Sequence, residues 1–208
     1  MNALSHSPLV YLVDDDDAVR DGLALLLRSV GLRSESHGDP QAFLATLSAQ
    51  SIGCVVLDIR MPGMGGLEVL ERLAECSDLP VVMLTGHGNV DLCRRAFKGG
   101  AMEFLQKPVD DDVFLDAVQA AVRLHIASRE RQAVSLAASE RLARLSGREH
   151  DVLVRIVTGM SNKEIARELE LSPRTVETYR ANVFDKLEAD SLAQLIRQYA
   201  SLLDEPSP

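Results

Sequence analysis

Short apolar runs alternate with longer segments of helical periodicity through the first 125 residues of this chain. Strands that alternate with helices indicate βαβ units, which build parallel sheets through right-handed crossovers. The predicted strands are residues 10–13, 33–36, 54–57, 81–84 and 103–105, and the predicted helices are 19–30, 40–49, 67–76 and 90–98, with a fifth beginning near Asp111. The pattern predicts an α/β domain with a five-stranded parallel sheet, for which we expect the doubly wound order 2-1-3-4-5.

Polar residues stand where four of these strands end. Four consecutive aspartates, Asp14 to Asp17, end the first strand, Asp58 ends the third, Thr85 ends the fourth, and Lys107 follows the fifth. The carboxyl ends of parallel strands line one edge of a sheet, and the switch point of this sheet order lies between strands 1 and 3. Asp14, Asp15 and Asp58 are therefore expected to converge at that edge.

Carboxylates held this close repel one another unless a cation lies among them. A set of oxygen ligands favours Mg²⁺, and Lys107 would add a compensating charge. A carboxylate beside Mg²⁺ and an ammonium group can attack a phosphoryl group and form an acyl phosphate. Asp58 is the best candidate for this nucleophile, because one of the paired acids after the first strand is better placed to hold the metal.

Four motifs at these positions resemble those of the receiver domains of two-component response regulators. They are Val-Tyr-Leu-Val-Asp-Asp at 10–15, Leu-Asp-Ile-Arg-Met-Pro at 57–62 with Gly65 and Gly66, Leu-Thr-Gly at 84–86, and Phe-Leu-Gln-Lys-Pro at 104–108. The motifs are distributed over nearly the whole of residues 8–125. Each motif is weak by itself, whereas four in register are specific.

The resemblance implies a role for each residue of the pocket. It makes Asp58 the residue that a sensor histidine kinase phosphorylates. It implies that Mg²⁺ is bound by Asp15, Asp58 and the carbonyl of Arg60, and by Asp14 through water. It also implies that Thr85 and Phe104 form a switch pair, in which the threonine bonds the phosphoryl group and the ring turns inward, and that the Lys107-Pro108 peptide bond is cis.

Plainer interpretations stay open beside these roles. Asp16 and Asp17 are expected in a solvated turn, His87 is expected in a loop, and Phe104 by itself is also consistent with a core position.

A phosphatase or phosphotransferase that acts on outside substrates is a rival function. No second acid stands two positions after Asp58 to serve as a general acid, so the chain is not expected to be an enzyme. A second rival is a phosphorylation-independent DNA-binding protein, against which the intact acid set argues.

A helical connector is expected after the sheet. No glycine or proline occurs between Val109 and Leu145, so the fifth helix can continue past the end of the sheet domain. Apolar residues thin out toward its middle, which favours a long solvated helix over a flexible glycine/serine linker. The predicted organisation is a receiver domain over 1–123, a helical linker over 124–144 and a DNA-binding domain over 145–208.

The last part of the chain is predicted to form four short helices, whose caps are visible in the sequence. Capping boxes are expected at Ser146 with Glu149, Ser161 with Glu164, and Ser191 with Gln194; Gly159 stands where the first helix should end, and Ser172 with Pro173 should begin the third. Two of these helices joined by a tight turn before Val176 suit a helix-turn-helix, a motif that binds DNA.

The third of these helices has two distinct faces at about 100° per residue. Val176, Val183 and Leu187 form an apolar stripe, and the opposite face carries Arg174, Glu177, Thr178, Ala181, Asn182 and Asp185. Small and polar side chains allow a helix to approach base edges in the major groove. Phosphate contacts are expected from Lys163, Arg174, Thr175, Tyr179 and Lys186.

This segment resembles the LuxR-type output domain of the FixJ/NarL response regulators. The matching stretches are Leu-Ser-Gly-Arg-Glu at 145–149, Ser-Asn-Lys-Glu-Ile-Ala at 161–166, Ser-Pro-Arg-Thr-Val-Glu at 172–177 and Lys-Leu at 186–187; residues 172–183 look especially like the FixJ branch. The resemblance places base readers at Glu177, Thr178 and Ala181. Many relatives carry a cationic side chain at the position of Glu177. An acid at this position either accepts a hydrogen bond from N4 of cytosine or only disfavours binding to incorrect DNA sequences.

The formal net charge of −9 argues against nucleic acid until it is divided along the chain. Residues 1–125 carry 10 Lys and Arg against 18 Asp and Glu, whereas residues 126–208 carry 12 against 13. DNA binding would therefore rest on a local basic patch and on dimerisation.

The last helix carries Leu192, Leu195, Ile196 and Tyr199 on one face, which is expected to be core of the bundle or partly a dimer seam.

The remaining features favour a cytoplasmic location. Its three cysteines, Cys54, Cys76 and Cys93, lack metal-binding spacing and are expected to be free thiols. No apolar run is long enough to span a membrane, and no signal peptide is evident. The sequence thus predicts a transcription factor that a sensor histidine kinase phosphorylates on Asp58, which promotes a homodimer that binds double-stranded DNA. RNA polymerase is a further candidate partner, and no membrane is expected.

Overall fold

The computed structural model describes residues 7–86 and 90–203, and of residues 201–203 only the backbone. His87, which was expected in a loop, falls outside the described residues. The chain divides into two compact units, Met1–Arg129 and Glu130–Pro208. This division falls inside the segment 124–144 that is predicted to be a linker.

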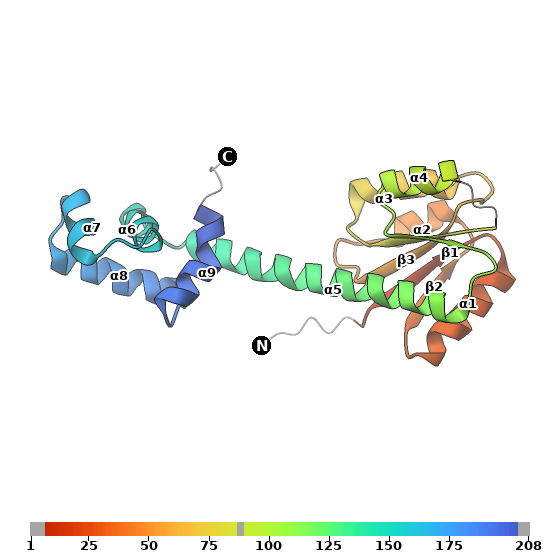
Figure 1. Ribbon diagram of the computed structural model, residues 1–208, viewed down its shortest axis with the longest axis horizontal. Helices are drawn as coiled ribbons and strands as arrows, with labels where there is room; N and C mark the ends of the chain where they lie inside the picture. Colours follow the sequence, from red (N-terminus) through yellow and green to blue (C-terminus); the bar gives the residue numbers. More distant parts are fainter. Residues whose placement is uncertain (1–6, 87–89, 204–208) are drawn as a thin grey trace. The chain divides into compact units, whose positions relative to one another are not determined.

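The first unit contains a five-stranded parallel sheet of order β2-β1-β3-β4-β5, as predicted (Figure 1). Its strands are β1 (Leu9–Val13), β2 (Arg33–His37), β3 (Gly53–Asp58), β4 (Val81–Thr85) and β5 (Glu103–Gln106). They alternate with α1 (Asp17–Ser29), α2 (Pro40–Thr46), α3 (Gly66–Cys76), α4 (Val90–Lys98) and α5 (Asp111–Leu142). The expected fold class is therefore confirmed for this unit.

Different helices cover the two faces of the sheet, because successive side chains of a strand point to opposite faces. On β1, Leu12 belongs to the same core cluster as Phe114 of α5, whereas Tyr11 belongs to the cluster of Phe43 of α2. As Figure 1 shows, α1 and α5 cover one face, and α2, α3 and α4 cover the other. All residues of β3 and β4 are buried, as is typical of parallel strands covered on both faces.

Two helix boundaries differ from the predicted ones because of local hydrogen bonds. α1 begins at Asp17 and not at residue 19, since the carboxylate of Asp16 caps it by accepting the N–H groups of Ala18 at 2.9 Å and Val19 at 3.3 Å. α2 ends at Thr46 and not at residue 49. The next residue is extended, and residues 48–51 form a turn in which a backbone N–H···O bond of 3.0 Å joins residues 51 and 48.

α5 is one continuous helix, as the absence of glycine and proline predicts. Within the first unit, the buried His125 joins it to the first residue of β3 and to the loop before β4. Nδ1 of His125 accepts the N–H of Gly53 at 3.1 Å, and Nε2 lies 3.2 Å from Oδ1 of Asp78. Arg129 lies 3.4 Å from the same carboxylate oxygen and also donates to the carbonyl of Ala49. These contacts fix the turns of α5 that end the first unit.

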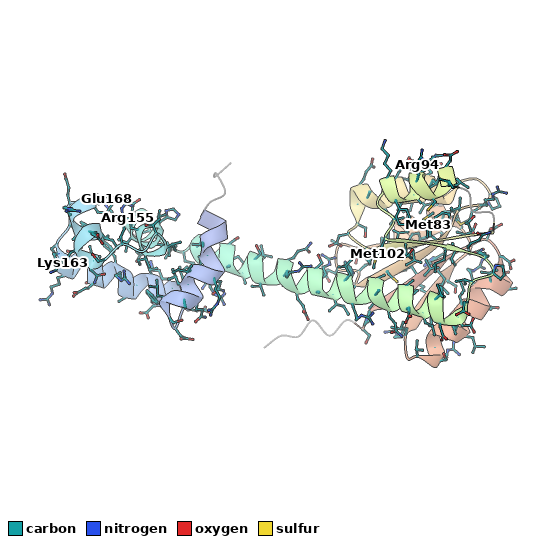
Figure 2. All side chains as sticks on the ribbon, in the orientation of Figure 1. Met83, Arg94, Met102, Arg155, Lys163 and Glu168 are labelled. Carbon is teal, nitrogen blue, oxygen red and sulfur yellow. The ribbon has the colours of Figure 1, made fainter. Side chains whose placement is uncertain are left out.

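The second unit is helical, as predicted. It contains α6 (Gly147–Val157), α7 (Asn162–Glu168), α8 (Pro173–Leu187) and α9 (Leu192–Leu203). Its core gathers Val152, Ile156, Ile165, Val176, Leu195 and Tyr199, and Ala138 at the end of α5 joins it. Figure 2 labels Arg155 of α6 and Glu168 of α7, whose ion pair of 2.9 Å links these two helices.

The predicted caps are present, with one variation at α9. Reciprocal capping boxes form at Ser146 with Glu149 and at Ser161 with Glu164, Ser172 caps α8 ahead of Pro173, and Gly159 follows α6 with a positive φ. At α9, Ser191 accepts the N–H of Gln194 at 3.2 Å as predicted. The amide oxygen of Gln194, however, accepts the N–H of Asp190 and not that of Ser191. The side chain of Gln194 thus bonds the residue before the N-cap and not the N-cap itself.

The apolar stripe of α9 divides into a buried and an exposed half. Leu195 and Tyr199 are fully buried, and the Tyr199 hydroxyl donates to the carbonyl of Leu187 at 3.0 Å. Leu192 and Ile196 are 42% and 36% exposed. One half of the stripe is therefore core of the unit, and the other half remains available for the predicted dimer seam.

The cysteines are free thiols, as predicted. Burial raises the pKa of the Cys54 thiol to about 12, so this cysteine is an inert packing residue. Among the described residues, no helix combines the length and the apolar composition that crossing a bilayer requires.

Candidate phosphorylation site and nucleic-acid interface

The carboxyl edge of the sheet brings together the polar residues that the sequence places at strand ends. Asp58 and Thr85 are the last residues of β3 and β4, and Asp14 directly follows β1. β3 lies between β1 and β4, with Leu57 opposite Val13 and Asp58 opposite Leu84. Asp14 and Asp58 are only 4% and 5% exposed. Two buried carboxylates thus meet at the predicted switch point.

Lys107 holds these two carboxylates together. Its ammonium group donates to Oδ2 of Asp14 at 2.5 Å and to Oδ1 of Asp58 at 2.7 Å. Burial disfavours the charged ammonium, but the hydrogen bonds and charges of Asp14 and Asp58 outweigh burial and raise the pKa of Lys107 above its usual value. Lys107 is therefore held in its charged form at neutral pH, and its peptide bond to Pro108 is cis, as the resemblance implies.

The second oxygen of each carboxylate is also hydrogen-bonded. Oδ1 of Asp14 accepts the N–H of Asp16 at 3.0 Å, and Oδ2 of Asp58 accepts the N–H of Arg60 at 2.6 Å. These bonds fix the orientation of both carboxylates before any ligand binds. With one ammonium for two carboxylates, the buried group keeps one negative charge, and Asp15, the exposed neighbour of Asp14 in the chain, adds a second.

The donor set fits a hard divalent cation in its chemistry. All the predicted ligands are oxygens, from Asp14, Asp15, Asp58 and the carbonyl of Arg60, which is the set that Mg²⁺ prefers. The excess negative charge of the pocket also requires a cation. Within the described ranges, no three side chains of Asp, Glu, His or Cys are grouped so as to hold a metal ion by themselves. The site as it stands is thus a pair of carboxylates joined by Lys107, and the exposed Asp15, which follows Asp14 in the chain, is not grouped with them.

Thr85 and Phe104 lie on the same face of the sheet. Phe104 pairs with Met83 across β4 and β5, and Thr85 is two residues beyond Met83, so their side chains share a face. Thr85 is fully buried at the edge that carries Asp58. Phe104 is half-buried against the core cluster of that face. The pair thus shares one face of the sheet, and Phe104 also packs against the core of that face.

Gly66 fits the start of α3 tightly against the backbone of Asp58. A Cβ atom at this position would lie 2.0 Å from the carbonyl oxygen of Asp58 and 2.9 Å from Cα of Ile59. The N–H of Gly66 donates to the carbonyl of Ile59 at 2.9 Å. The neighbouring Gly65 has room, since its Cβ would lie 3.6 Å from the nearest atom. The position of Asp58 therefore depends on a glycine at 66 but not at 65.

Arg20 is a site residue that the sequence analysis missed. Its guanidinium donates to the carbonyl oxygen of Asp14 and pairs with Asp17, one turn earlier on α1. Asp16 and Asp17 are exposed, as expected, but they cap α1 and hold Arg20. The only sequence signal for Arg20 is its spacing of three residues from Asp17, which is common on solvated helices.

The faces of α8 agree with the periodicity argument. Val176, Val183 and Leu187 are fully buried in the core of the second unit. On the opposite face, Arg174, Glu177, Thr178, Ala181 and Asp185 are exposed, whereas Asn182 is half-buried. Of the predicted phosphate contacts, Lys163 is exposed on α7, where Figure 2 labels it, and Thr175 and Tyr179 are half-buried.

Lys186, another predicted phosphate contact, is engaged inside the protein. Its ammonium group lies 2.6 Å from Oε2 of Glu149, the buried acid of the α6 capping box. The same oxygen accepts the N–H of Ser146 at 2.7 Å and its hydroxyl at 2.9 Å. The hydrogen bond from Lys186, followed by that from the Ser146 backbone, lowers the pKa of Glu149 to about 2. Lys186 thus ties the end of α8 to the start of α6.

Glu149→Gln is expected to lower the free energy of unfolding of the second unit by about 1–2 kcal/mol at neutral pH, because the amide cannot pair with Lys186. The folded-state pKa of Glu149 lies below its unfolded value, so the charged acid stabilises the fold above pH 4.5 and this contribution is lost as the pH falls from 4.5 to about 2. Urea unfolding followed by circular dichroism should therefore show the two proteins converging across this range.

The control for this prediction is Glu164→Gln. Glu164 makes the same bonds to Ser161 in the α7 capping box but is exposed, and its pKa is lowered mainly by the Ser161 hydroxyl. Its replacement should cost less than that of Glu149. Equal losses in the two variants, or a Glu149 effect that does not change with pH, would contradict the role given to Lys186.

Comparisons with known proteins agree with both halves of the chain. The family model of the response regulator receiver domain matches residues 10–119, and that of the bacterial regulatory proteins of the luxR family matches residues 143–199. The chain is 46% identical to the transcriptional regulatory protein FixJ of Bradyrhizobium diazoefficiens over 90% of this chain and 92% of that protein. It is 40% identical to FixJ of Rhizobium meliloti, over 90% of this chain and 93% of that protein.

Solved structures give the same result. The response regulator StyR matches with a TM-score of 0.85 and 39% identity over 94% of this chain and 100% of that one. Full-length FixJ from B. japonicum matches with a TM-score of 0.58 and 42% identity over 97% of this chain and 100% of that one. The chain therefore belongs to the FixJ-like two-component response regulators, transcription factors in which a receiver domain is joined to a LuxR-type DNA-binding domain.

Proposed function

We propose that Asp58 is the phosphoryl acceptor of this response regulator and that a partner sensor histidine kinase is the donor. The observation that carries the proposal is the ammonium of Lys107, shared by the buried carboxylates of Asp14 and Asp58. A carboxylate held beside a fixed cation can receive a phosphoryl group, because the cation offsets the charge that accumulates on the phosphoryl oxygens.

The transfer is a single displacement at phosphorus. An oxygen of Asp58 forms a bond to the phosphorus atom, the bond from phosphorus to the kinase imidazole breaks, and the imidazole leaves with the electron pair. Lys107 neutralises the transferring oxygens, and the Arg60 N–H holds Asp58 in place. Asp15, Asp58 and the carbonyl of Arg60 would hold Mg²⁺, and Asp14 would act through water. Bound there, Mg²⁺ would supply two positive charges to the acids and the phosphoryl oxygens.

Thr85 and Phe104 are proposed to carry the signal away from Asp58. The buried hydroxyl of Thr85 would bond the phosphoryl group, and the ring of Phe104 would turn inward on the same face of the sheet. A shift of this kind moves a population between two existing conformations and does not create a new one. We propose that the shifted population forms a homodimer on double-stranded DNA, where two half-sites lie an integral number of helical turns apart.

The proposed DNA interface is the exposed face of α8 with the helices beside it. Its members are Lys163, Arg174, Thr175, Glu177, Thr178, Tyr179, Ala181, Asn182 and Lys186. Lys186 would have to share its ammonium between Glu149 and a phosphate.

We further propose that the protein acts in the cytoplasm, contacts RNA polymerase while bound to DNA, and does not hydrolyse phosphoesters of other molecules.

Deoxyribonuclease footprinting on the promoter of its target gene, with and without acetyl phosphate, tests the proposal. The wild-type protein is expected to protect its site at lower concentration when acetyl phosphate is present, and Asp58→Ala is expected to show no change. Asp21→Ala, which removes an exposed acid on α1, is the matched control and should behave as the wild type. Identical footprints for the wild type and Asp58→Ala under both conditions would reject phosphorylation control.

A further inference from the structure

The centre of the exposed face of α8 carries no hydrogen-bond donor. Glu177, Thr178 and Ala181 are all exposed there. A carboxylate only accepts hydrogen bonds, and an alanine offers only a methyl group. The hydroxyl of Thr178 donates its proton to the carbonyl of Arg174 at 3.1 Å, which leaves an acceptor oxygen and a methyl group. The three side chains together present acceptors and methyl groups alone.

Donors are confined to the ends of this face. Arg174 lies one turn before Glu177, at the amino end of α8, and Asn182 is half-buried beyond Ala181. At the carboxyl end, the ammonium of Lys186 is bonded to Glu149. The pattern along the helix is therefore a donor, then acceptors and methyl groups, then a partly covered amide.

Base edges in the major groove differ in what they offer to such a surface. Guanine presents two acceptors, N7 and O6, and would repel an acceptor surface, whereas cytosine presents the N4 amino donor and thymine a methyl group. Adenine presents a donor beside the acceptor N7, so a carboxylate that bonds its amino group also faces N7. Cytosine is thus the base whose edge best matches a carboxylate.

We infer that Glu177 reads the N4 amino group of a cytosine in the operator, and that Thr178 and Ala181 pack against an adjacent thymine methyl group. This inference rests on the proposed DNA interface and adds the base class that it selects. A purely repulsive role for Glu177 differs in one measurable respect. A reader strengthens binding to the preferred site, whereas a repulsive acid weakens binding to every site through the phosphates.

Selection from a randomised DNA library with the full-length protein and acetyl phosphate tests the inference. The wild type is expected to enrich a site with a cytosine at one position in each half-site. Glu177→Gln is expected to prefer adenine at that position, because a glutamine amide pairs with N6 and N7. In competition assays its preference for cytosine over adenine should fall by about tenfold or more. Glu177→Ala should bind the wild-type site more weakly and lose the preference at that position only.

Asp185→Asn is the matched control, since it makes the same acid-to-amide change at an exposed position two turns further along α8. It should leave the cytosine preference unchanged. If the wild type enriches no sequence, the proposed DNA function fails. If it enriches one, the inference fails on any of three results: Glu177→Gln enriches the same bases, Glu177→Ala binds every site more tightly, or Asp185→Asn shifts the same position.

Discussion

A Lys107→Met protein is expected to take up phosphoryl groups from acetyl phosphate about 100-fold more slowly than the wild type, because it lacks the cation aimed at the transferring oxygens. It is also expected to lose about 3 kcal/mol of unfolding free energy, since Asp14 and Asp58 then lie buried without their shared partner. Radiolabel uptake in the presence of Mg²⁺ measures the first effect, and urea unfolding in the presence of a chelator measures the second.

Two further measurements connect this loss to charge. Asp14→Asn in the Lys107→Met background should recover part of the lost stability, because it removes one of the two repelling carboxylates. Added Mg²⁺ should stabilise Lys107→Met more than the wild type, since the divalent ion supplies charge that the variant lacks. Lys98→Met makes the same change at an exposed lysine of α4 and should alter neither property. A Lys107→Met protein that is as stable and as readily labelled as the wild type would remove the basis for this site.

The second large effect is expected for Gly66→Ala. The new methyl group would lie 2.0 Å from the carbonyl oxygen of Asp58, and the atoms that must move are backbone atoms. Overpacking of this kind costs about 3 kcal/mol. Labelling should also slow, because the displaced atoms belong to Asp58, the proposed phosphoryl acceptor. The same two assays, unfolding and radiolabel uptake, measure the result.

Gly65→Ala provides the comparison for this variant. Its methyl group would lie 3.6 Å from the carbonyl oxygen of Ile59, an ordinary contact, so stability and labelling should stay close to those of the wild type. The two glycines stand side by side in the sequence and differ only in what surrounds them. Equal effects of the two substitutions would show that the start of α3 is not packed against Asp58 in the way described.

The carboxyl edge of the sheet could be predicted because it follows from topology. Asp14, Asp58 and Thr85 each stand at the end of a parallel strand, and strand ends in such a sheet share an edge whatever the details of packing. The stripe and the opposite face of α8 could be predicted for a similar reason, since both follow from the helical period alone. The positions of strand ends and the spacing of apolar residues can both be read directly from a sequence.

The remaining contacts depend on side-chain reach across the fold, which a sequence does not display. Lys186 and Glu149 stand 37 residues apart, and neither has a local pattern that marks an ion pair. Arg20 bonds a backbone carbonyl, which has no sequence signature. The end of α2 depends on one hydrogen bond in the turn that follows it. The variation at Gln194 depends on one hydrogen bond at the start of α9.

The anchoring of α5 by His125 has a consequence for the protons of its ring. A backbone N–H can only donate, so the bond from Gly53 requires that Nδ1 carry no hydrogen and that the ring proton sit on Nε2, facing Asp78. With the proton on Nδ1 instead, two N–H groups would face each other and Nε2 would have no proton to donate to Asp78. The contact of α5 with β3 thus depends on one tautomer of His125.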